Sequence, residues 1–157
     1  MKTAFLLNGK AVQAEIRPDE TLFELLRNLG CKSVKCSCET ANCGSCSVMF
    51  NGSPVLSCSI PAARADGEEI VTLEGLQEEA SIFAEFMADQ GADQCGYCNA
   101  GFVLNVLAMR RELGDNPSEE EIKTYLAGNL CRCTGFVSQH RAIQAYLVAM
   151  RKGGAAE

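Results

Sequence analysis

Ten cysteines in a chain of 157 residues are the feature that most limits what this sequence can form. They fall into two groups, because six lie between positions 31 and 58 and four between positions 95 and 133. A disulfide framework is typical of secreted chains, but the start, MKTAFLLNGKAVQAE, becomes polar too early for a signal peptide. The grouping therefore favours bound metal or redox chemistry in the cytoplasm.

The first group contains a loop, CETANCGSC, with the plant-type spacing of a 2Fe-2S ferredoxin site. Two tetrahedral irons need two thiolates each, so a loop that supplies three of them must turn sharply, which Gly44 permits. A zinc knuckle or reduced buried thiols are the alternatives. The predicted ligands are separated by four, two and eleven residues: Cys38, Cys43, Cys46 and Cys58.

Two cysteines of the first group lie outside this spacing. Cys36, used in place of Cys38, would lengthen the first gap from four residues to six and lose the ferredoxin pattern. We therefore expect Cys36 and Cys31 to be small apolar fillers or weak hydrogen-bonding neighbours of the site.

The second group consists of two pairs, in QCGYC and GNLCRCTG, with 32 residues between them. Each pair directly precedes a segment with helical spacing, so two helix N-termini would stabilise thiolates and a negative cluster at one point. Arg132 adds a positive charge there, although a solvated surface arginine explains it equally well. This pattern also suits zinc or a redox dithiol, but four cysteines suffice for a second 2Fe-2S cluster: Cys95, Cys98, Cys131 and Cys133.

Hydrophobic periodicity divides the chain into a strand-rich first part and a helical second part. Asn-Gly pairs at 8–9 and 51–52 predict hairpins of strands 3–7 with 12–16 and 47–50 with 54–58, and a further strand is expected at 70–73. A helix capped by Thr21 and Glu24, with Leu29 in its apolar stripe, should end at Gly30. The predicted helices of the second part are 79–90, with Ile82 facing inward, 100–112, 118–128, with a Ser118 and Glu121 cap and a stop at Gly128, and 138–151.

Charge and motifs exclude several classes of function. The chain has 14 basic and 20 acidic residues, a net charge of −6, which argues against a nucleic-acid-binding surface. No segment approaches the roughly 20 apolar residues that cross a bilayer. There is no P-loop, Rossmann motif or catalytic triad, and the single histidine, His140, is expected at the surface or an interface rather than as a catalytic base.

The cysteine motifs and their flanking residues resemble the small iron-sulfur subunit of the molybdenum hydroxylase, or xanthine dehydrogenase, family over nearly the whole chain. The segments that carry this resemblance are SVKCSC at 33–38, NCGSCSV at 42–48, SCSIPA at 57–62, VTLEGL at 71–76, QCGYC at 94–98 and GNLCRCTGF at 128–136.

The resemblance implies an α+β fold, with a ferredoxin-like β-grasp domain at 1–76 and a four-helix domain at 77–157, each holding one 2Fe-2S cluster. It implies a hetero-oligomer in which electrons pass from molybdopterin in a large subunit through both clusters to an FAD subunit or another acceptor. Gln94 and Cys133 would contact the pterin, and the substrate would be a purine or another N-heterocycle. The alternatives are a stand-alone two-cluster ferredoxin-type carrier and a zinc-stabilised module.

This sequence departs from the family pattern in two places. Glycines are common in the family where Glu39 and Ala41 stand, so the dihedral angles and charge of the first cysteine loop are expected to differ. The family often has Thr-Pro after CGYC, whereas this chain has Asn99 and Ala100, and Asn99 would serve as the helix N-cap.

Overall fold

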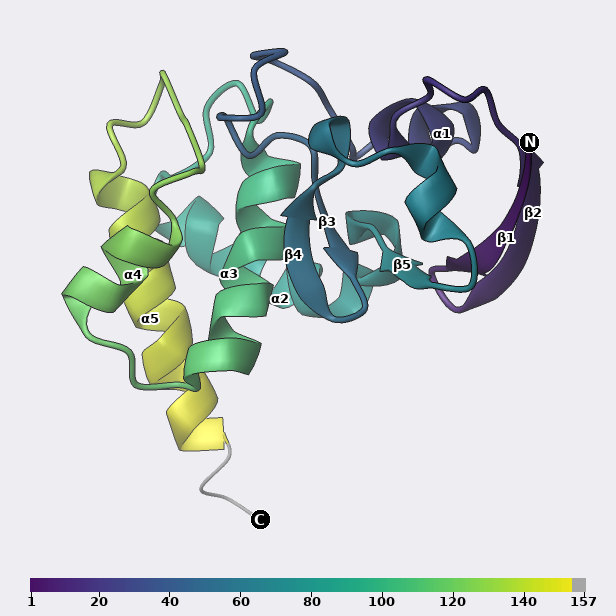
Figure 1. The fold of residues 1–157 in the computed structure, drawn as a ribbon. Coiled ribbons are helices and arrows are strands. Elements are labelled where there is room, and N and C mark those ends of the chain that lie inside the picture. The colour runs from purple at the N-terminus through teal and green to yellow at the C-terminus, as the bar shows by residue number, and fades with distance from the viewer. Residues whose placement is uncertain (154–157) are drawn as a thin grey trace.

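The first part of the computed structural model is a five-stranded sheet with one helix against it, and the second part is a group of helices (Figure 1). The structure describes residues 1–153, so positions 154–157 of the predicted second domain lie outside the described residues. The sheet has the order β2-β1-β5-β3-β4, with β1 and β5 parallel and the other pairs antiparallel. Its strands are β1 (Lys2–Leu7), β2 (Lys10–Glu15), β3 (Ser47–Phe50), β4 (Ser53–Leu56) and β5 (Glu69–Val71).

Both predicted hairpins are confirmed. Asn8 and Gly9 have φ angles of 51° and 77°, and Asn51 and Gly52 have 49° and 83°, as a tight turn with two left-handed residues requires. The predicted strands 54–58 and 70–73 are too long, since the chain leaves the sheet after Leu56 and after Val71 and enters short 3-10 turns. At the start of the turn at Ser57–Ser59, the Ser57 hydroxyl donates to the Cys46 carbonyl at 2.7 Å.

Helix α1 (Leu22–Asn28) begins with the predicted capping box. The Glu24 backbone N–H donates to the Thr21 hydroxyl at 3.2 Å, and the Thr21 N–H donates to the Glu24 carboxylate at 2.8 Å. Gly30 has a φ of 91° and ends the helix as expected. The prediction that Leu29 belongs to the buried stripe is wrong, because Leu29 caps the helix end and remains 38% exposed.

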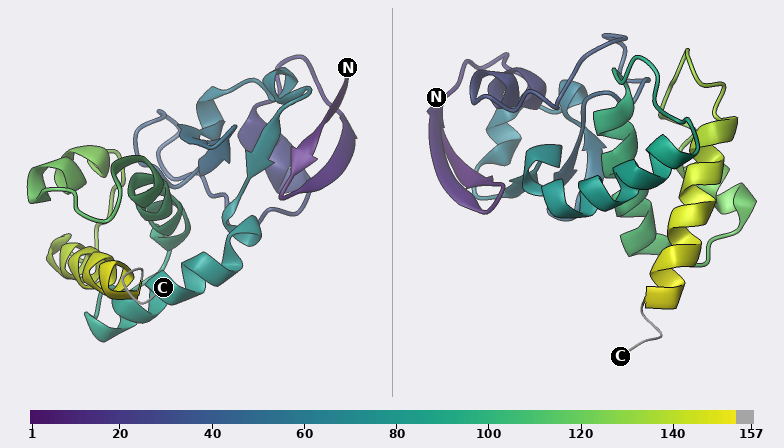
Figure 2. Two further views of the ribbon diagram at one scale, coloured as in Figure 1. Left: turned by 90° about the horizontal axis from the view of Figure 1, so that it is seen from below. Right: turned by 180° about the vertical axis from the view of Figure 1, so that it is seen from behind.

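The four predicted helices of the second part are present as α2 (Gln77–Asp89), α3 (Asn99–Leu113), α4 (Glu119–Tyr125) and α5 (Val137–Gly153). Helix α2 runs from the end of the sheet to α5, with which it packs (Figure 2). Helix α4 ends before Gly128, which has no left-handed φ, so Gly128 is not its terminator. Ile82 is 44% exposed and does not face inward as predicted, because α2 presents Phe83 and Met87 to the core.

Helix α3 is the centre of the second part. It packs between strands β3 and β4 on one side and α2 on another, so every residue from 101 to 109 is buried. Sequence periodicity predicts only one buried face for this helix, and the wider burial follows from its central position. The α+β class with a sheet domain before helices is confirmed.

Buried apolar side chains form two clusters, one around α1 and the sheet and one around α3. Met49 of β3 belongs to the second cluster, so the sheet contributes to the core of the helical part. The division at 76 and 77 stays a proposal, supported by the two cores. Between residues 1 and 153, no helix has both the length and the apolar character that crossing a membrane requires.

Replacing Gln139 by leucine is expected to raise the free energy of unfolding by about 1–2 kcal/mol. Gln139 is 2% exposed on the core side of α5, and neither its amide oxygen nor its amide nitrogen has a hydrogen-bond partner among residues 1–153. Leucine fills a similar volume without burying these polar atoms. Urea unfolding of the two chains measures the change, and Gln144→Leu, at an exposed position of α5, is the matched control. A less stable Gln139→Leu chain would contradict the expectation.

Candidate iron-sulfur centres

The first cysteine loop connects α1 to β3 and protrudes from the sheet (Figure 1). Gly44 turns this loop with a φ of 75°, as the sequence predicts. Glu39 and Ala41 also adopt left-handed φ angles, of 53° and 52°. Both residues therefore adopt a left-handed backbone although neither is glycine, which costs about 1–2 kcal/mol of conformational energy for each residue.

The thiols of the four predicted ligands in the first group lie in two pairs. Cys38 contacts Cys43, and Cys58 contacts Cys46. The Asn42 backbone N–H points at the Cys38 sulfur at 3.4 Å and, with contacts from Thr40 and Cys43, lowers the pKa of Cys38 to about 6. Burial raises the pKa of Cys58 to about 12, with the neighbouring Cys46 thiol as the second cause.

These pKa shifts predict that Cys38 is the most reactive thiol of its group in the iron-free chain. A lowered pKa leaves Cys38 as thiolate above about pH 6, whereas Cys58 stays protonated through pH 7. The alkylation rate of Cys38 by iodoacetamide should be half-maximal near pH 6 and level off above about pH 7. Mass spectrometry of the labelled peptides across this pH range measures the rates at both cysteines. A Cys38 rate that still rises steeply above pH 8, as for an ordinary thiol, would contradict the expectation.

The second group surrounds a cavity of about 460 Å³ that all four of its cysteines line. The Cys95 and Cys133 sulfurs are 3.5 Å apart and exposed, whereas Cys98 contacts Cys131. Burial, followed by the contact with Cys131, raises the pKa of Cys98 to about 11. The Thr134 hydroxyl donates to the Cys131 sulfur at 3.1 Å.

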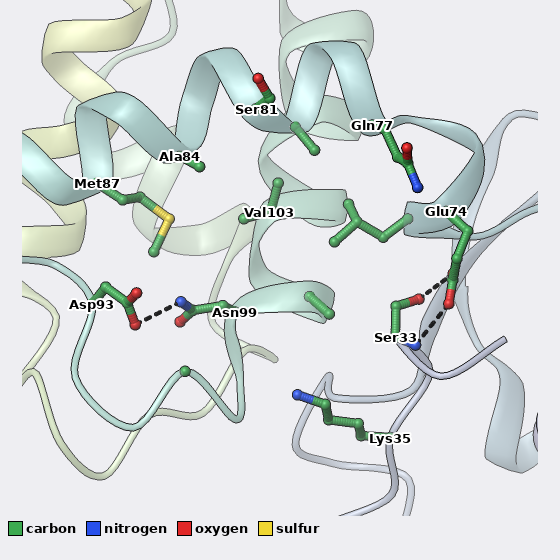
Figure 3. A pocket seen from close by; sticks show the side chains of 14 residues that line it. Ser33, Lys35, Glu74, Gln77, Ser81, Ala84, Met87, Asp93, Asn99 and Val103 are labelled. Carbon is green, nitrogen blue, oxygen red and sulfur yellow. Dashed lines mark hydrogen bonds between the residues drawn. The ribbon is translucent and has the colours of Figure 1, made fainter.

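The second group lies at the N-terminal ends of α3 and α5, as predicted. Cys98 itself is the N-cap of α3, so the prediction that Asn99 is the cap is wrong. Asn99 is the first helical residue, and its side chain instead donates to Asp93 at 2.9 Å (Figure 3). Arg132 is exposed and lines the cavity, so solvent and the site both contact this residue.

A junction that sequence reasoning missed brings the two groups together. The Leu130 backbone N–H donates to the carbonyl oxygen of Cys43 at 3.0 Å. The Asn105 side chain of α3 donates to both Ser47 and Asn129, at 2.9 and 3.0 Å. These bonds fix the loop that carries Cys43 to the loop that precedes Cys131.

Close packing of two glycines completes this junction. A Cβ atom on Gly101, in the first turn of α3, would overlap the carbonyl oxygen of Gly44, and one on Gly44 would lie 2.6 Å from the Gly128 oxygen. Only glycine therefore allows the two backbones to approach this closely. The left-handed turn was predictable for Gly44, but nothing local in the sequence marks Gly101 as its neighbour.

A second connection between the two cysteine groups lies on the side of the molecule shown in Figure 3. An open pocket of about 500 Å³ separates α2 from residues 33–35 there. The Lys35 ammonium donates to the Tyr97 carbonyl at 3.2 Å and lies 4.9 Å from the centre of the Tyr97 ring. The Tyr97 hydroxyl donates to the Cys36 carbonyl at 3.2 Å. Beside them, the Glu74 carboxylate accepts from the backbone N–H and hydroxyl of Ser33. The segment between Cys95 and Cys98 is thus tied to the start of the first cysteine loop.

The remaining candidates are Cys31, Cys36, His140 and Gln94. Cys31 is 5% exposed within the first core, where burial raises its pKa, as expected of an apolar filler. Cys36 is half-buried. His140 lies on α5 with its Nε2 atom 3.9 Å from the Glu119 carboxylate. Gln94 is exposed beside Cys95.

The thiol arrangement fits the ligand pattern of diiron clusters. The sulfurs of the predicted ligands lie in four pairs, and each iron of a 2Fe-2S cluster takes two thiolates. Backbone N–H and hydroxyl donors next to Cys38 and Cys131 also match the negative charge that such clusters carry.

Comparison with known proteins agrees with this chemistry. Residues 9–94 match the 2Fe-2S iron-sulfur cluster binding domain, and residues 72–144 match the 2Fe-2S binding domain. The nicotinate dehydrogenase small FeS subunit of Eubacterium barkeri is 42% identical over 141 residues, which are 88% of this chain and 89% of the relative. The chain belongs to the family of small iron-sulfur subunits of molybdenum hydroxylases. As in the rest of this family, it is an iron-sulfur subunit of an oxidoreductase complex.

Other relatives extend the comparison to different substrates. The xanthine dehydrogenase iron-sulfur-binding subunit of Escherichia coli O157:H7 is 41% identical over 133 residues, which are 83% of this chain and 84% of the relative. A chain of the quinoline 2-oxidoreductase structure from Pseudomonas putida 86 superposes with a TM-score of 0.88 at 34% identity, covering 98% and 97% of the two chains. The aldehyde oxidoreductase of Desulfovibrio desulfuricans gives 0.86 at 30% identity, and there the match covers 96% of this chain but 17% of the longer one.

Proposed function

We propose that this subunit carries single electrons from a molybdopterin site in a large partner subunit, through two 2Fe-2S clusters, to an FAD subunit or another acceptor. The first cluster would be held by Cys38 and Cys43 on one iron and Cys46 and Cys58 on the other. The second would be held by Cys95 with Cys133 and Cys98 with Cys131. A 2Fe-2S cluster supplies a one-electron redox centre, so two of them divide a two-electron oxidation into single transfers.

The observation that carries this proposal is the hydrogen bond from the Leu130 N–H to the Cys43 carbonyl, at 3.0 Å. Leu130 directly precedes Cys131, so one residue and one hydrogen bond join a predicted ligand of the second cluster to a predicted ligand of the first. Gly44, Gly101 and Asn105 hold the two backbones in this contact. A chain that only stored two clusters would not need them so closely connected.

The exposed side of the second centre supports docking of the large subunit there. Leu130 and Phe136 are 47% and 45% exposed and line the same cavity as the exposed Cys133, and Val137, which follows Phe136, is 60% exposed. Exposed apolar side chains that gather at one place mark interaction surfaces. Gln94 and Cys133 on this face would contact the pterin, and the first cluster would face the flavin subunit.

The comparisons support an N-heterocyclic substrate for the complex. The relatives include subunits of nicotinate and xanthine dehydrogenases and a quinoline oxidoreductase, and all three of these molecules are N-heterocycles. The substrate pocket would lie in the large subunit. Location in the cytoplasm remains a prediction.

Anaerobic reduction of the purified complex tests the proposal. The chain should co-purify with two partners, one carrying molybdopterin and one carrying flavin, and nicotinate, xanthine or quinoline should bleach its visible iron-sulfur absorption. A chain that purifies alone, with clusters reduced by a small reductase but by none of the three heterocycles in cell extract, would favour the stand-alone ferredoxin-type carrier. A colourless protein that contains zinc would contradict both.

A further inference from the structure

A buried serine hydroxyl lies within hydrogen-bond distance of the sulfur of a predicted ligand of the first cluster. The Ser45 side chain is 4% exposed, and its Oγ atom is 3.4 Å from the Cys43 sulfur. The same oxygen is 2.8 Å from the Oγ atom of Ser37, which is exposed to solvent. Both serines also line the cavity of the second group, so the hydroxyl pair lies between the two centres.

Iron binding would reverse the donor at this contact. In the iron-free chain the Cys43 thiol donates to the Ser45 oxygen, but a thiolate has no proton and can only accept, so the contact is kept when the Ser45 hydroxyl donates to the Cys43 sulfur. The Ser45 oxygen is then free to accept from Ser37, whose own hydroxyl oxygen faces water. The Ser37 contact therefore polarises the Ser45 hydroxyl toward the sulfur.

We propose that Ser45, supported by Ser37, is a positioning residue that raises the reduction potential of the first cluster. A hydrogen bond to a ligand sulfur stabilises the reduced cluster more than the oxidised one, because reduction adds negative charge. The proposal rests on the proposed function and adds to it the residues that set the potential of the centre nearer the acceptor. Among residues 1–153, no other side-chain hydroxyl forms a hydrogen bond with the Cys43 sulfur.

Redox titration of the full chain loaded with iron and sulfide tests this proposal. EPR signals separate the two clusters, and the signal lost in a Cys58→Ser chain identifies the first. Ser45→Ala is expected to shift the potential of the first cluster downward and leave that of the second unchanged. Ser37→Ala should cause a smaller downward shift of the same cluster, because Ser45 keeps its contact with the sulfur.

Two further variants separate hydrogen bonding from a general effect of changing a serine. Ser45→Thr keeps the hydroxyl and should restore most of the potential. Ser59→Ala removes a hydroxyl that donates to the Leu56 carbonyl beside Cys58 and should cause no shift. If Ser45→Ala fails to take up iron, the Ser37→Ala titration decides the question.

Three results would overturn the proposal: an unchanged or higher potential of the first cluster in both alanine variants, a shift confined to the second cluster, or an equal shift in Ser59→Ala. These outcomes differ from failure of the proposed function. A wild-type chain that takes up no iron contradicts the electron-transfer role itself, whereas an iron-loaded chain with an unshifted potential contradicts only the role of Ser45.

Discussion

Replacing Cys98 by serine is expected to lower the iron content of the subunit from about four to about two atoms per chain, and to stop the proposed electron transfer from the partner subunit's molybdopterin. Cys98 is partly buried at the start of α3 and contacts Cys131, so it supplies one of the two thiolates for one predicted iron. Serine oxygen is a harder ligand than thiolate and suits iron-sulfur chemistry less well. The four predicted ligands of the first cluster are unchanged, so that cluster should remain.

Iron analysis, EPR after full reduction and substrate-dependent reduction of the acceptor measure these effects in the complex. Cys36→Ser is the matched control, because Cys36 belongs to the first group but lies outside its ferredoxin spacing. The control should keep about four irons and normal transfer. A Cys98→Ser complex with four irons, or one in which the acceptor is still reduced at the normal rate, would contradict the assignment of this ligand.

Local features of the fold were predictable because short segments determine them. The Asn-Gly hairpins depend on two residues that tolerate left-handed φ angles, and the caps at Thr21 and Ser118 depend on a side chain three residues further on. The proximity of the paired cysteines was predictable for a similar reason, since ligand spacing follows from the geometry of a cluster held by one loop, and their role as ligands stays a prediction.

The junction between the two centres was not predictable from such signals. Asn105 bonds to Ser47, 58 positions earlier, and to Asn129, 24 positions later, so no short window contains these contacts. The same limit explains the errors at Ile82 and Leu29. Periodicity predicts that a helix has an apolar face, but not which of its residues remain exposed. The packing of α2 against α5 decides this for Ile82, and the position of Leu29 at the end of α1 decides it for Leu29.

Adding a single Cβ atom at Gly101 tests this junction. Gly101→Ala is expected to lower the free energy of unfolding by about 3 kcal/mol or more, because the new Cβ would overlap the Gly44 carbonyl oxygen and lie 3.1 Å from the Ser45 Cα atom. Both atoms belong to backbone, which cannot rotate away as a flexible side chain does. The two loops would have to separate, and the Leu130 bond to Cys43 would lengthen or break.

Urea unfolding of the iron-free chains measures the loss of stability, and electron transfer between the centres in the loaded complex measures the loss of contact. Gly128→Ala is the control, since a Cβ there meets no atom within 4 Å and the residue has no left-handed φ. It should change the stability by less than about 0.5 kcal/mol. If Gly101→Ala were as stable as this control and still passed electrons at the normal rate, the close approach of the two glycines would not be what joins the centres. If it were unstable but retained normal transfer, the junction would hold the fold together without providing the route for electrons.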